Sequence, residues 1–550
     1  MNVKKYKANY FPPPERCCDW TARERIEKAP IWCSVDLRDG NQALVTPMEL
    51  DEKLEFFGYL VKLGFKQIEV GFPAASDTEY AFMRRLIDGG LIPADVTVQV
   101  LTQCRPHIID KTLKSLDGVN DAIVHFYNST SKAQREQVFG LPKKDIVKIA
   151  TDAAKLIKKS TGDKYIYEYS PESFTGTEPE FALEIINSVI DVIRPDRKRK
   201  MIINLPVTVE TSMPHMYACQ VEYIKKNVID PDSVIISTHP HNDRGTGVAD
   251  AELALLAGAE RVEGTLFGNG ERTGNADIVT LALNMFSHGV DPELDFSNLN
   301  ETIEVYRKFT GMKIPPRQPY AGSLVFTAFS GSHQDAIAKG GKYRKEHPDA
   351  KWDLPYLPID PEDVGRNYDA DVIRINSQSG KGGIAYVLEQ RFGYVIPKAM
   401  REDIGYKIKG ISDKEHRELK PDEVAEIFAR DYIDVCAPIA LKSFSFDKTD
   451  AEVLLSMRLD VDGKEAVIIG NGNGQFNAAA SALKRAKGLD FTTVLYSEHA
   501  LEQGSKSLAA AYVGLKRGDS TFYAVGIDPD IMTASIKALI GAVNKILRKA

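Results

Sequence analysis

The feature that most constrains this fold is a regular alternation of short apolar runs and helical patterns along the first half of the chain. The runs are rich in β-branched and aromatic residues, as strands are. Between them, stretches such as 49–64 have apolar residues at three- and four-residue spacing, which indicates amphipathic helices. We predict eight strands, at 31–37, 67–72, 96–102, 122–127, 165–170, 201–206, 234–240 and 261–268.

Eight strand–helix alternations of this length are what a (β/α)8 barrel, or TIM barrel, requires. The alternative is an open, doubly wound sheet, which does not usually need eight parallel strands. We therefore predict an α/β protein with an N-terminal arm over 1–30 and a catalytic barrel over 31–300.

The middle of the chain does not continue the alternation of strands and helices. Pro-rich breaks at 314–322 and 354–363 separate short helical patterns. Such proline-rich segments are typical of loops between small helical elements rather than of a sheet. We predict helical linker subdomains over 301–430.

The last part of the chain contains an internal repeat. Residues 461–486 resemble 516–541, and Gly470 matches Gly526 at a separation of 56 residues. Each copy is predicted to form a ββα-type unit, and duplicated units of this kind usually pair about a pseudo-twofold axis. We therefore predict a separate α+β domain over 431–550.

Composition and charge exclude several classes of function. The formal net charge is −7, with acidic and basic residues interleaved, so no basic stripe points to nucleic acid. No apolar run reaches the ~18 residues that a membrane span needs. Six cysteines without a C-x-x-C pair fit reduced thiols, so we expect a cytoplasmic protein that acts on small molecules.

The expected ends of strands 1 and 7 carry residues suited to a metal. His239 and His241 flank one residue on an extended segment, so both imidazoles point to one face. Asp39 follows the first strand and can supply a carboxylate. Two imidazoles and one carboxylate leave open positions on a divalent ion, as a catalytic metal needs. Beside them, Arg38 offers a positive charge for a developing oxyanion, or else a purely structural ion pair.

Five motifs together identify the chain as similar to the 2-isopropylmalate synthase family of metal-dependent TIM barrels. They are DLRDGNQAL (36–44), IEVGFPAAS (68–76), STHPHND (237–243), GNGERTGNAD (268–277) and SQSGKGG (377–383). The wider superfamily often has D-R-E in its first motif, where this chain has Leu37-Arg38-Asp39. The resemblance covers nearly the whole chain.

The resemblance implies a Claisen-type condensation of acetyl-CoA with 3-methyl-2-oxobutanoate, followed by thioester hydrolysis to 2-isopropylmalate and CoA. It implies an acyltransferase of leucine biosynthesis that uses Mg²⁺, Mn²⁺ or Zn²⁺. Whether a monovalent cation such as K⁺ also takes part is left open. Homocitrate or citramalate synthase of the same superfamily is the first alternative. An inactive amino-acid-sensing interaction protein is the second.

The resemblance also assigns roles to individual residues. Metal ligands would be Asp39, His239 and His241, with Asn275 close by; Arg38 and Glu172 would lie near the reacting atoms. Contacts to the keto acid would come from His125, Ser170, Asn204, Pro206 and Thr208, with Leu101 shaping the pocket for the isopropyl group.

The family also implies a homodimer in which His333 and Tyr368 reach the partner's site. His333 would serve as a general base; from the residues alone, His333 could equally cap a helix and Tyr368 could lie in a core.

The repeat domain resembles the family's leucine-sensing regulatory domain. A Gly-rich loop that leads into a helix N-terminus presents free N–H groups, which suit an amino-acid carboxylate. We therefore expect leucine, as an inhibitor, to contact Gly470, Gly472, Gly474 and Ala478. A dimerisation module without a ligand is the alternative.

Overall fold

The computed structural model describes residues 1–6, 11–328, 330–368, 381–417, 419–449, 452–501 and 507–549. Residues 377–380 of the SQSGKGG motif lie outside this set. The chain forms two compact units, Met1–Val325 with Pro361–Asn367, and Phe326–Asp360 with Tyr368–Ala550. Among the helices described, none is long and apolar enough to cross a membrane.

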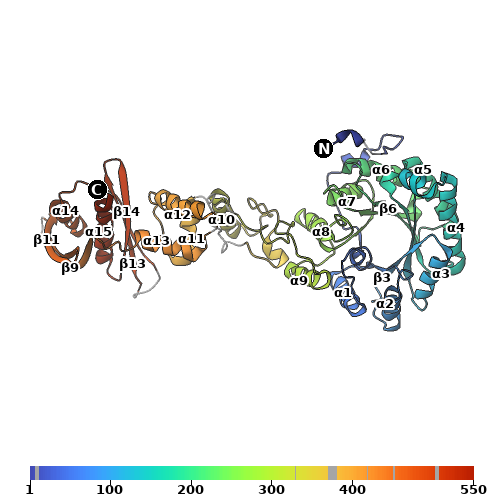
Figure 1. Cartoon of the computed structure of the whole chain (residues 1–550), viewed down its shortest axis with the longest axis horizontal. Helices are drawn as coiled ribbons and strands as arrows, with labels where there is room; N and C mark the ends of the chain where they lie inside the picture. Colours follow the sequence, from blue (N-terminus) through green and yellow to red (C-terminus); the bar gives the residue numbers. More distant parts are fainter. Residues whose placement is uncertain are drawn as a thin grey trace. The chain divides into compact units, whose positions relative to one another are not determined.

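The first unit is a closed barrel of eight parallel strands in chain order, surrounded by helices (Figure 1). The prediction of a TIM barrel is confirmed. The strands are β1 (Ile31–Ser34), β2 (Gln67–Gly71), β3 (Thr97–Gln103), β4 (Ala122–Ser129), β5 (Ile166–Glu172), β6 (Met201–Val207), β7 (Val234–Pro240) and β8 (Arg261–Gly264). The helices are α1 (Leu50–Leu63), α2 (Asp77–Asp88), α3 (Pro106–Ser115), α4 (Lys143–Thr161), α5 (Pro179–Ile193), α6 (Pro214–Asn227), α7 (Gly247–Leu256) and α8 (Ile278–Ser287), followed by α9 (Leu299–Thr310).

The first strand ends earlier than its apolar run predicts. The carbonyl of Val35 accepts hydrogen bonds from the N–H groups of Arg38 (3.2 Å), Asp39 (2.9 Å) and Gly40 (3.1 Å). These bonds close a wide helical turn over Asp36–Gly40 in place of the strand. The turn positions Arg38 and Asp39 at the carboxyl end of the barrel.

The last strand is also shorter than predicted, because β8 gives way to a turn at Leu266–Gly268. Gly264 allows this change: a Cβ there would lie 2.6 Å from the carbonyl oxygen of Ala276. The chain after β8 therefore folds back against its own strand end, which brings Asn275 beside His241.

The second unit joins helices to two three-stranded antiparallel sheets, ordered β11-β10-β9 and β12-β13-β14. Its helices are α10 (Gly331–Glu346), α11 (Lys381–Phe392), α12 (Arg401–Glu415), α13 (Pro421–Tyr432), α14 (Gln475–Lys487) and α15 (Ile531–Lys549). Its strands are β9 (Ile439–Lys448), β10 (Val453–Val461), β11 (Lys464–Gly472), β12 (Thr492–Ala500), β13 (Ala509–Arg517) and β14 (Ser520–Asp528). One apolar cluster joins both sheets to α14 and α15, and a second joins α11, α12 and α13 to β13 and β14.

Each copy of the repeat has one strand more than the sequence indicates, so the units are βββα. The strands missed are β9 and β12, which precede the similar segments. Both are edge strands with many exposed side chains, so they have no clear apolar alternation. The duplicated strand–helix pairing itself is as predicted.

Gly470 and Gly526 match in the repeat because both let a strand approach a helix closely. A Cβ on Gly470 would lie 2.6 Å from the backbone nitrogen of Ala482 in α14. A Cβ on Gly526 would lie 2.6 Å from the backbone nitrogen of Ala538 in α15. Backbone cannot yield as a flexible side chain can, so no larger residue fits at either position.

We predict that Gly526→Ala destabilises the second unit by ~1–3 kcal/mol, the usual cost of overpacking a core. The matched control is Gly410→Ala, at a helical position where a Cβ meets nothing within 4 Å. Removing that helical glycine should stabilise by ~0.5–1 kcal/mol. Scanning calorimetry of the three proteins measures both effects. Equal losses in both variants would contradict the packing role of Gly526.

Candidate active site

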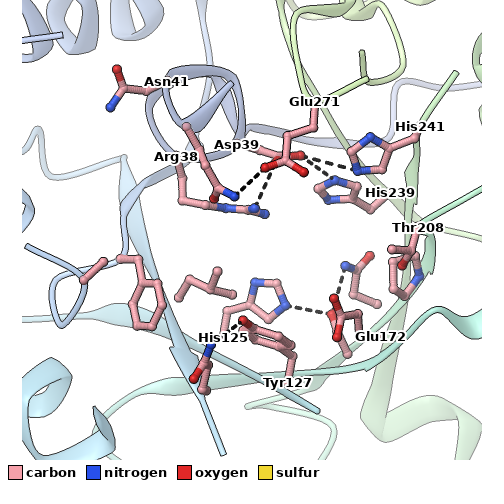
Figure 2. Close-up of a pocket in the computed structure, with 18 of the residues that line it drawn as sticks. Arg38, Asp39, Asn41, His125, Tyr127, Glu172, Thr208, His239, His241 and Glu271 are labelled. Atoms are coloured by element: carbon pink, nitrogen blue, oxygen red, sulfur yellow. Dashed lines mark hydrogen bonds and ion pairs between the residues drawn. The ribbon is translucent and has the colours of Figure 1, made fainter. Parts of the chain in front are cut away.

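A cavity of about 610 Å³ opens at the carboxyl ends of the barrel strands (Figure 2). Parallel strands bring all these ends to one edge, so residues far apart in sequence converge there. The predicted site residues that line the cavity are Arg38, Asp39, Leu101, His125, Ser170, Glu172, Asn204, Pro206, Thr208, His239 and His241. Figure 2 shows Asp39 and the two metal-candidate histidines facing His125 and Glu172 across the cavity.

Asp39, His239 and His241 form a compact group of possible metal ligands. Oδ2 of Asp39 lies 3.2 Å from Nε2 of His239 and 3.6 Å from Nε2 of His241. All three side chains are buried. The turn after β1 supplies the carboxylate and the end of β7 supplies both imidazoles, as the H-x-H spacing predicts.

One buried atom beside this group fits a cation. Among the described residues, Oδ1 of Asn275, which pairs with His241 in an isolated bridge, is buried without a hydrogen-bond partner. The amide nitrogen of Asn275 donates to the carbonyl of Asn269 (3.0 Å), which leaves its oxygen as the free acceptor. An imidazole pair, a carboxylate and an amide oxygen are a donor set that divalent metals accept. The residues present therefore fit a divalent metal.

The electrostatics of the group favour a bound cation. Burial raises the pKa of Asp39, but the Arg38 guanidinium and the two imidazoles outweigh it and hold that pKa well below its usual range. Burial and the neighbouring His239 lower the pKa of His241 to about 4, so its imidazole is neutral near pH 7. Burial opposes protonation of His239, yet its carboxylate neighbours Asp39 and Glu263 raise its pKa to about 9. These carboxylates attract positive charge, whether a proton or a metal.

Arg38 holds two carboxylates at once. Its Nη1 lies 3.1 Å from Oδ1 of Asp39, and its Nε donates to Glu69 on β2. These contacts fix the guanidinium at the cavity wall. Both interpretations of Arg38 are therefore compatible with its position: it forms a structural ion pair, and it presents charge to the cavity.

The opposite wall carries a hydrogen-bonded chain of side chains. Nδ1 of His125 lies 2.8 Å from Glu69, and its Nε2 lies 2.7 Å from Oγ of Ser170. The amide of Asn204 donates to the same Ser170 oxygen (3.1 Å), while its own oxygen has no partner among the described residues. The chain fixes a hydroxyl, an imidazole and an amide along one side of the cavity.

The loops above the cavity are tied to each other. The hydroxyl of Thr208 accepts from the N–H of Ser173 (2.8 Å), and Glu172 accepts from Ser129. Arg272 donates to the carbonyl of Thr208 (2.5 Å) and pairs with Asp243 (2.7 Å). These bonds link the ends of β4, β5, β6 and β7 to the loop after β8.

Other lining residues were missed by the sequence analysis: Asn41, Gln42, Pro47, Phe72, Ala75, Ser76, Glu79, Gln103, Tyr127, Glu271 and Arg272. Most of them follow a strand directly or lie inside one of the motifs named above. Their place at the strand ends is the feature of the sequence that could have identified them.

A buried polar network within the strands was also missed. Its main members are Glu69, Gln99, Glu168, Arg261 and Glu263, all fully buried. The signal was present, since charged residues interrupt the apolar runs QIEVG and RVEG.

One part of this network could be mistaken for a second metal site. Glu69, His125 and Glu263 have ligand atoms close enough to share an ion. The amide nitrogen of Gln99 already lies between them, 2.7 Å from Glu69, 2.9 Å from Glu263 and 3.3 Å from His125. Gln99 therefore satisfies these groups without a cation.

The remaining predicted residues belong to the second unit. His333 lies on α10, where its ring stacks on Tyr356 at 3.9 Å. Tyr368 follows the segment that returns to the first unit. Their action in a partner's site stays a prediction.

The four predicted effector-binding residues differ in how exposed they are to solvent. Ala478 and Gly470 are buried between β11 and α14, whereas Gly472 and Gly474 keep exposed surface. Gly470 is required for packing, as described above. Contact between an effector and these four positions stays a prediction.

Family models match the chain in three segments. A model described as HMGL-like matches residues 29–305, and one described as alpha-isopropylmalate synthase, post-catalytic domain-like, matches residues 323–389. A third, the LeuA allosteric (dimerisation) domain, matches residues 418–547. The segments follow one another along nearly the whole chain.

Full-length relatives are similar over the whole chain. The 2-isopropylmalate synthase of Desulfitobacterium hafniense (strain Y51) is 56% identical over 100% of this chain and 99% of its own length. That of Helicobacter hepaticus is 56% identical over 100% of both. That of Clostridium acetobutylicum is 50% identical over 96% of both. The chain therefore belongs to the 2-isopropylmalate synthase family, a family of acyltransferases with a metal-dependent barrel.

Proposed function

We propose that this chain condenses acetyl-CoA with 3-methyl-2-oxobutanoate and water to give 2-isopropylmalate and CoA. The acetyl methyl carbon loses a proton and forms a bond to the keto carbon; water then cleaves the thioester C–S bond. The observation that carries the proposal is the group Asp39, His239 and His241 at one wall of a cavity whose other wall is a fixed polar chain. The identity of the relatives supports the choice of substrates.

A divalent metal held by Asp39, His239 and His241, with Asn275 nearby, would supply Lewis-acid polarisation of the keto carbonyl. Arg38 places a fixed positive charge near the same oxygen, where negative charge develops during bond formation. Both charges favour the alkoxide more than the neutral ketone.

Residues of the opposite wall orient the keto acid. His125, Ser170 and Asn204 are locked by their mutual hydrogen bonds, so their polar atoms are already fixed before the keto acid binds. Leu101 contributes an apolar surface for the isopropyl group. Pro206 and Thr208 bound the pocket beside His239, because β6 pairs with β7 at Pro206 and His239.

Glu172 lines the cavity and accepts from Ser129, so it can hold a proton or a water near the reacting carbon. His333 of a partner subunit is the proposed general base, since a neutral imidazole suits proton transfer near pH 7.

The proposed function predicts metal-dependent release of CoA with a preference for 3-methyl-2-oxobutanoate. The experiment measures free thiol with that acid, 2-oxoglutarate and pyruvate, before and after chelation. His241→Ala should lower kcat at least ~10²-fold, since loss of a metal ligand disables the site. A preference for 2-oxoglutarate would indicate homocitrate synthase. A preference for pyruvate would indicate citramalate synthase. If no acid supports CoA release, the proposed reaction is wrong and the alternative of an inactive amino-acid-sensing protein is favoured.

The dimer predicts complementation between two inactive chains. His333→Ala and His239→Ala should each be inactive alone, while their mixture should regain up to about a quarter of wild-type activity per site if subunits mix at random. This follows because only mixed dimers combine an intact barrel with an intact His333. Exchange between differently tagged chains is verified by native mass spectrometry. Exchange without recovered activity would show that His333 does not act in the partner's site.

The two halves of the repeat offer unequal sites for the carboxylate of leucine. At the start of α15, Asp530 accepts from the N–H and hydroxyl of Thr533, both at 2.7 Å. The equivalent position before α14 is Gly474, and no side chain caps that helix. We propose that leucine places its carboxylate at the N-terminus of α14, close to Gly472 and Gly474.

We predict that Gly474→Asp raises the leucine concentration for half-inhibition by about tenfold or more, because its carboxylate would repel that of leucine. A Cβ at Gly474 meets nothing within 4 Å and its φ is −168°, so the fold should tolerate the change. Gly474→Ala is the matched control and should keep wild-type inhibition. Gly472 is less suitable, because a Cβ there would lie 2.7 Å from the nitrogen of Ala478. Equal inhibition of Gly474→Asp and wild type would place leucine elsewhere.

A further inference from the structure

Glu263, on β8, contacts the proposed metal site and the proposed keto-acid site with one carboxylate. Its Oε2 lies 2.6 Å from Nδ1 of His239 and 3.1 Å from the amide nitrogen of Asn204. Its Oε1 accepts from Arg261 (2.8 Å) and from Gln99 (2.9 Å). The side chain is fully buried and does not line the cavity.

We propose that Glu263 is a positioning residue that orients His239 as a metal ligand and aligns it with Asn204. A carboxylate accepts hydrogen bonds, so Nδ1 of His239 carries a proton, and Nε2 would offer its lone pair to a metal held together with Asp39. This second carboxylate fixes the tautomer and ring angle of a ligating imidazole. The inference rests on the metal site of the proposed function.

The two histidines differ in this respect. His239 has Glu263 behind it, whereas Nδ1 of His241 is buried without a hydrogen-bond partner among the described residues. The more basic imidazole is therefore His239, and a divalent ion should depend on it more than on His241 for its affinity. Glu263 acts through this contact, because it touches neither the cavity nor the substrate.

Asn204 extends the argument to the substrate. Its amide nitrogen is shared between Glu263 and Ser170, each at 3.1 Å, and its oxygen has no partner in the part of the chain that the structure describes. Glu263 thereby fixes the orientation of the Asn204 amide beside Ser170 in the cavity wall. One oxygen of Glu263 thus sets the spacing between metal ligand and substrate contact.

A purely structural role for Glu263, as a counter-charge for Arg261, is the competing explanation. Glu168, a second buried carboxyl group of the network, lies 3.4 Å from Arg261 and 3.6 Å from Nε2 of His125, and it shares no hydrogen bond with His239 among the described residues. Glu168→Gln therefore removes a second carboxyl group beside Arg261 and leaves the contact between Glu263 and His239 in place. It is the matched control for Glu263→Gln, which keeps the shape of the side chain.

The test is calorimetric titration of Mn²⁺ into metal-free protein without substrates. Glu263→Gln should bind Mn²⁺ about 10–100-fold more weakly than wild type, the usual effect of losing such a partner. Glu168→Gln should stay within about twofold of wild type. Saturating Mn²⁺ should restore part of the CoA release of Glu263→Gln. Equal Mn²⁺ affinity in Glu263→Gln and wild type, or equal losses in both variants, would overturn the proposal.

Glu263→Asp covers the case in which Glu263→Gln does not fold. It keeps the charge near Arg261 but shortens the reach to His239, so Mn²⁺ affinity should fall while the melting temperature stays close to that of wild type. Unchanged affinity in a folded Glu263→Asp protein would contradict the positioning role. Wild type that binds no Mn²⁺ would refute the metal site and this inference together. Wild type that binds Mn²⁺ but releases no CoA would refute only the proposed reaction.

Discussion

The buried ion pair between Arg261 and Glu263 is the interaction on which the barrel interior depends. A guanidinium with no exposed surface is costly unless carboxylates and hydrogen-bond acceptors surround it. Arg261 has Glu263, Ser237, Gln67 and Gln99 within hydrogen-bond distance. With its charge compensated, Glu263 can stay ionised in the interior, and Arg261 holds its pKa well below the usual range.

The interior nevertheless has more acids than permanent cations. Asp39, Glu69, Glu168 and Glu263 face two guanidinium groups, those of Arg38 and Arg261. Burial raises the pKa of Glu168 well above its usual range, which favours its neutral form. Two of the other carboxylates, Asp39 and Glu263, contact His239. A divalent cation held at Asp39 would compensate negative charge at the wall of the cavity where the proposed reaction polarises a ketone.

Much of the fold could be predicted because it follows from periodicity. Eight apolar runs separated by helical patterns define the barrel, and residues at strand ends such as Asp39 and His239 must then converge. The prediction was weaker for features that depend on contacts between distant residues, because the local sequence pattern does not reveal such contacts. β9 and β12 have exposed faces without alternation, and Glu263 appears in the sequence as one acid inside an apolar run. Its role depends on His239 and Asn204, which the closed barrel brings to it.

The apolar cluster that joins α11, α12 and α13 to β13 and β14 has a consequence for how such a chain can be divided. Leu388, Ile404 and Phe428 of the helices share this cluster with Tyr512 and Val525 of the sheet. A chain cut between α13 and β9 would expose the apolar sides of three helices to water. The linker helices and the second sheet therefore form one inseparable folding unit, and any exchange of regulatory modules between relatives must transfer them together.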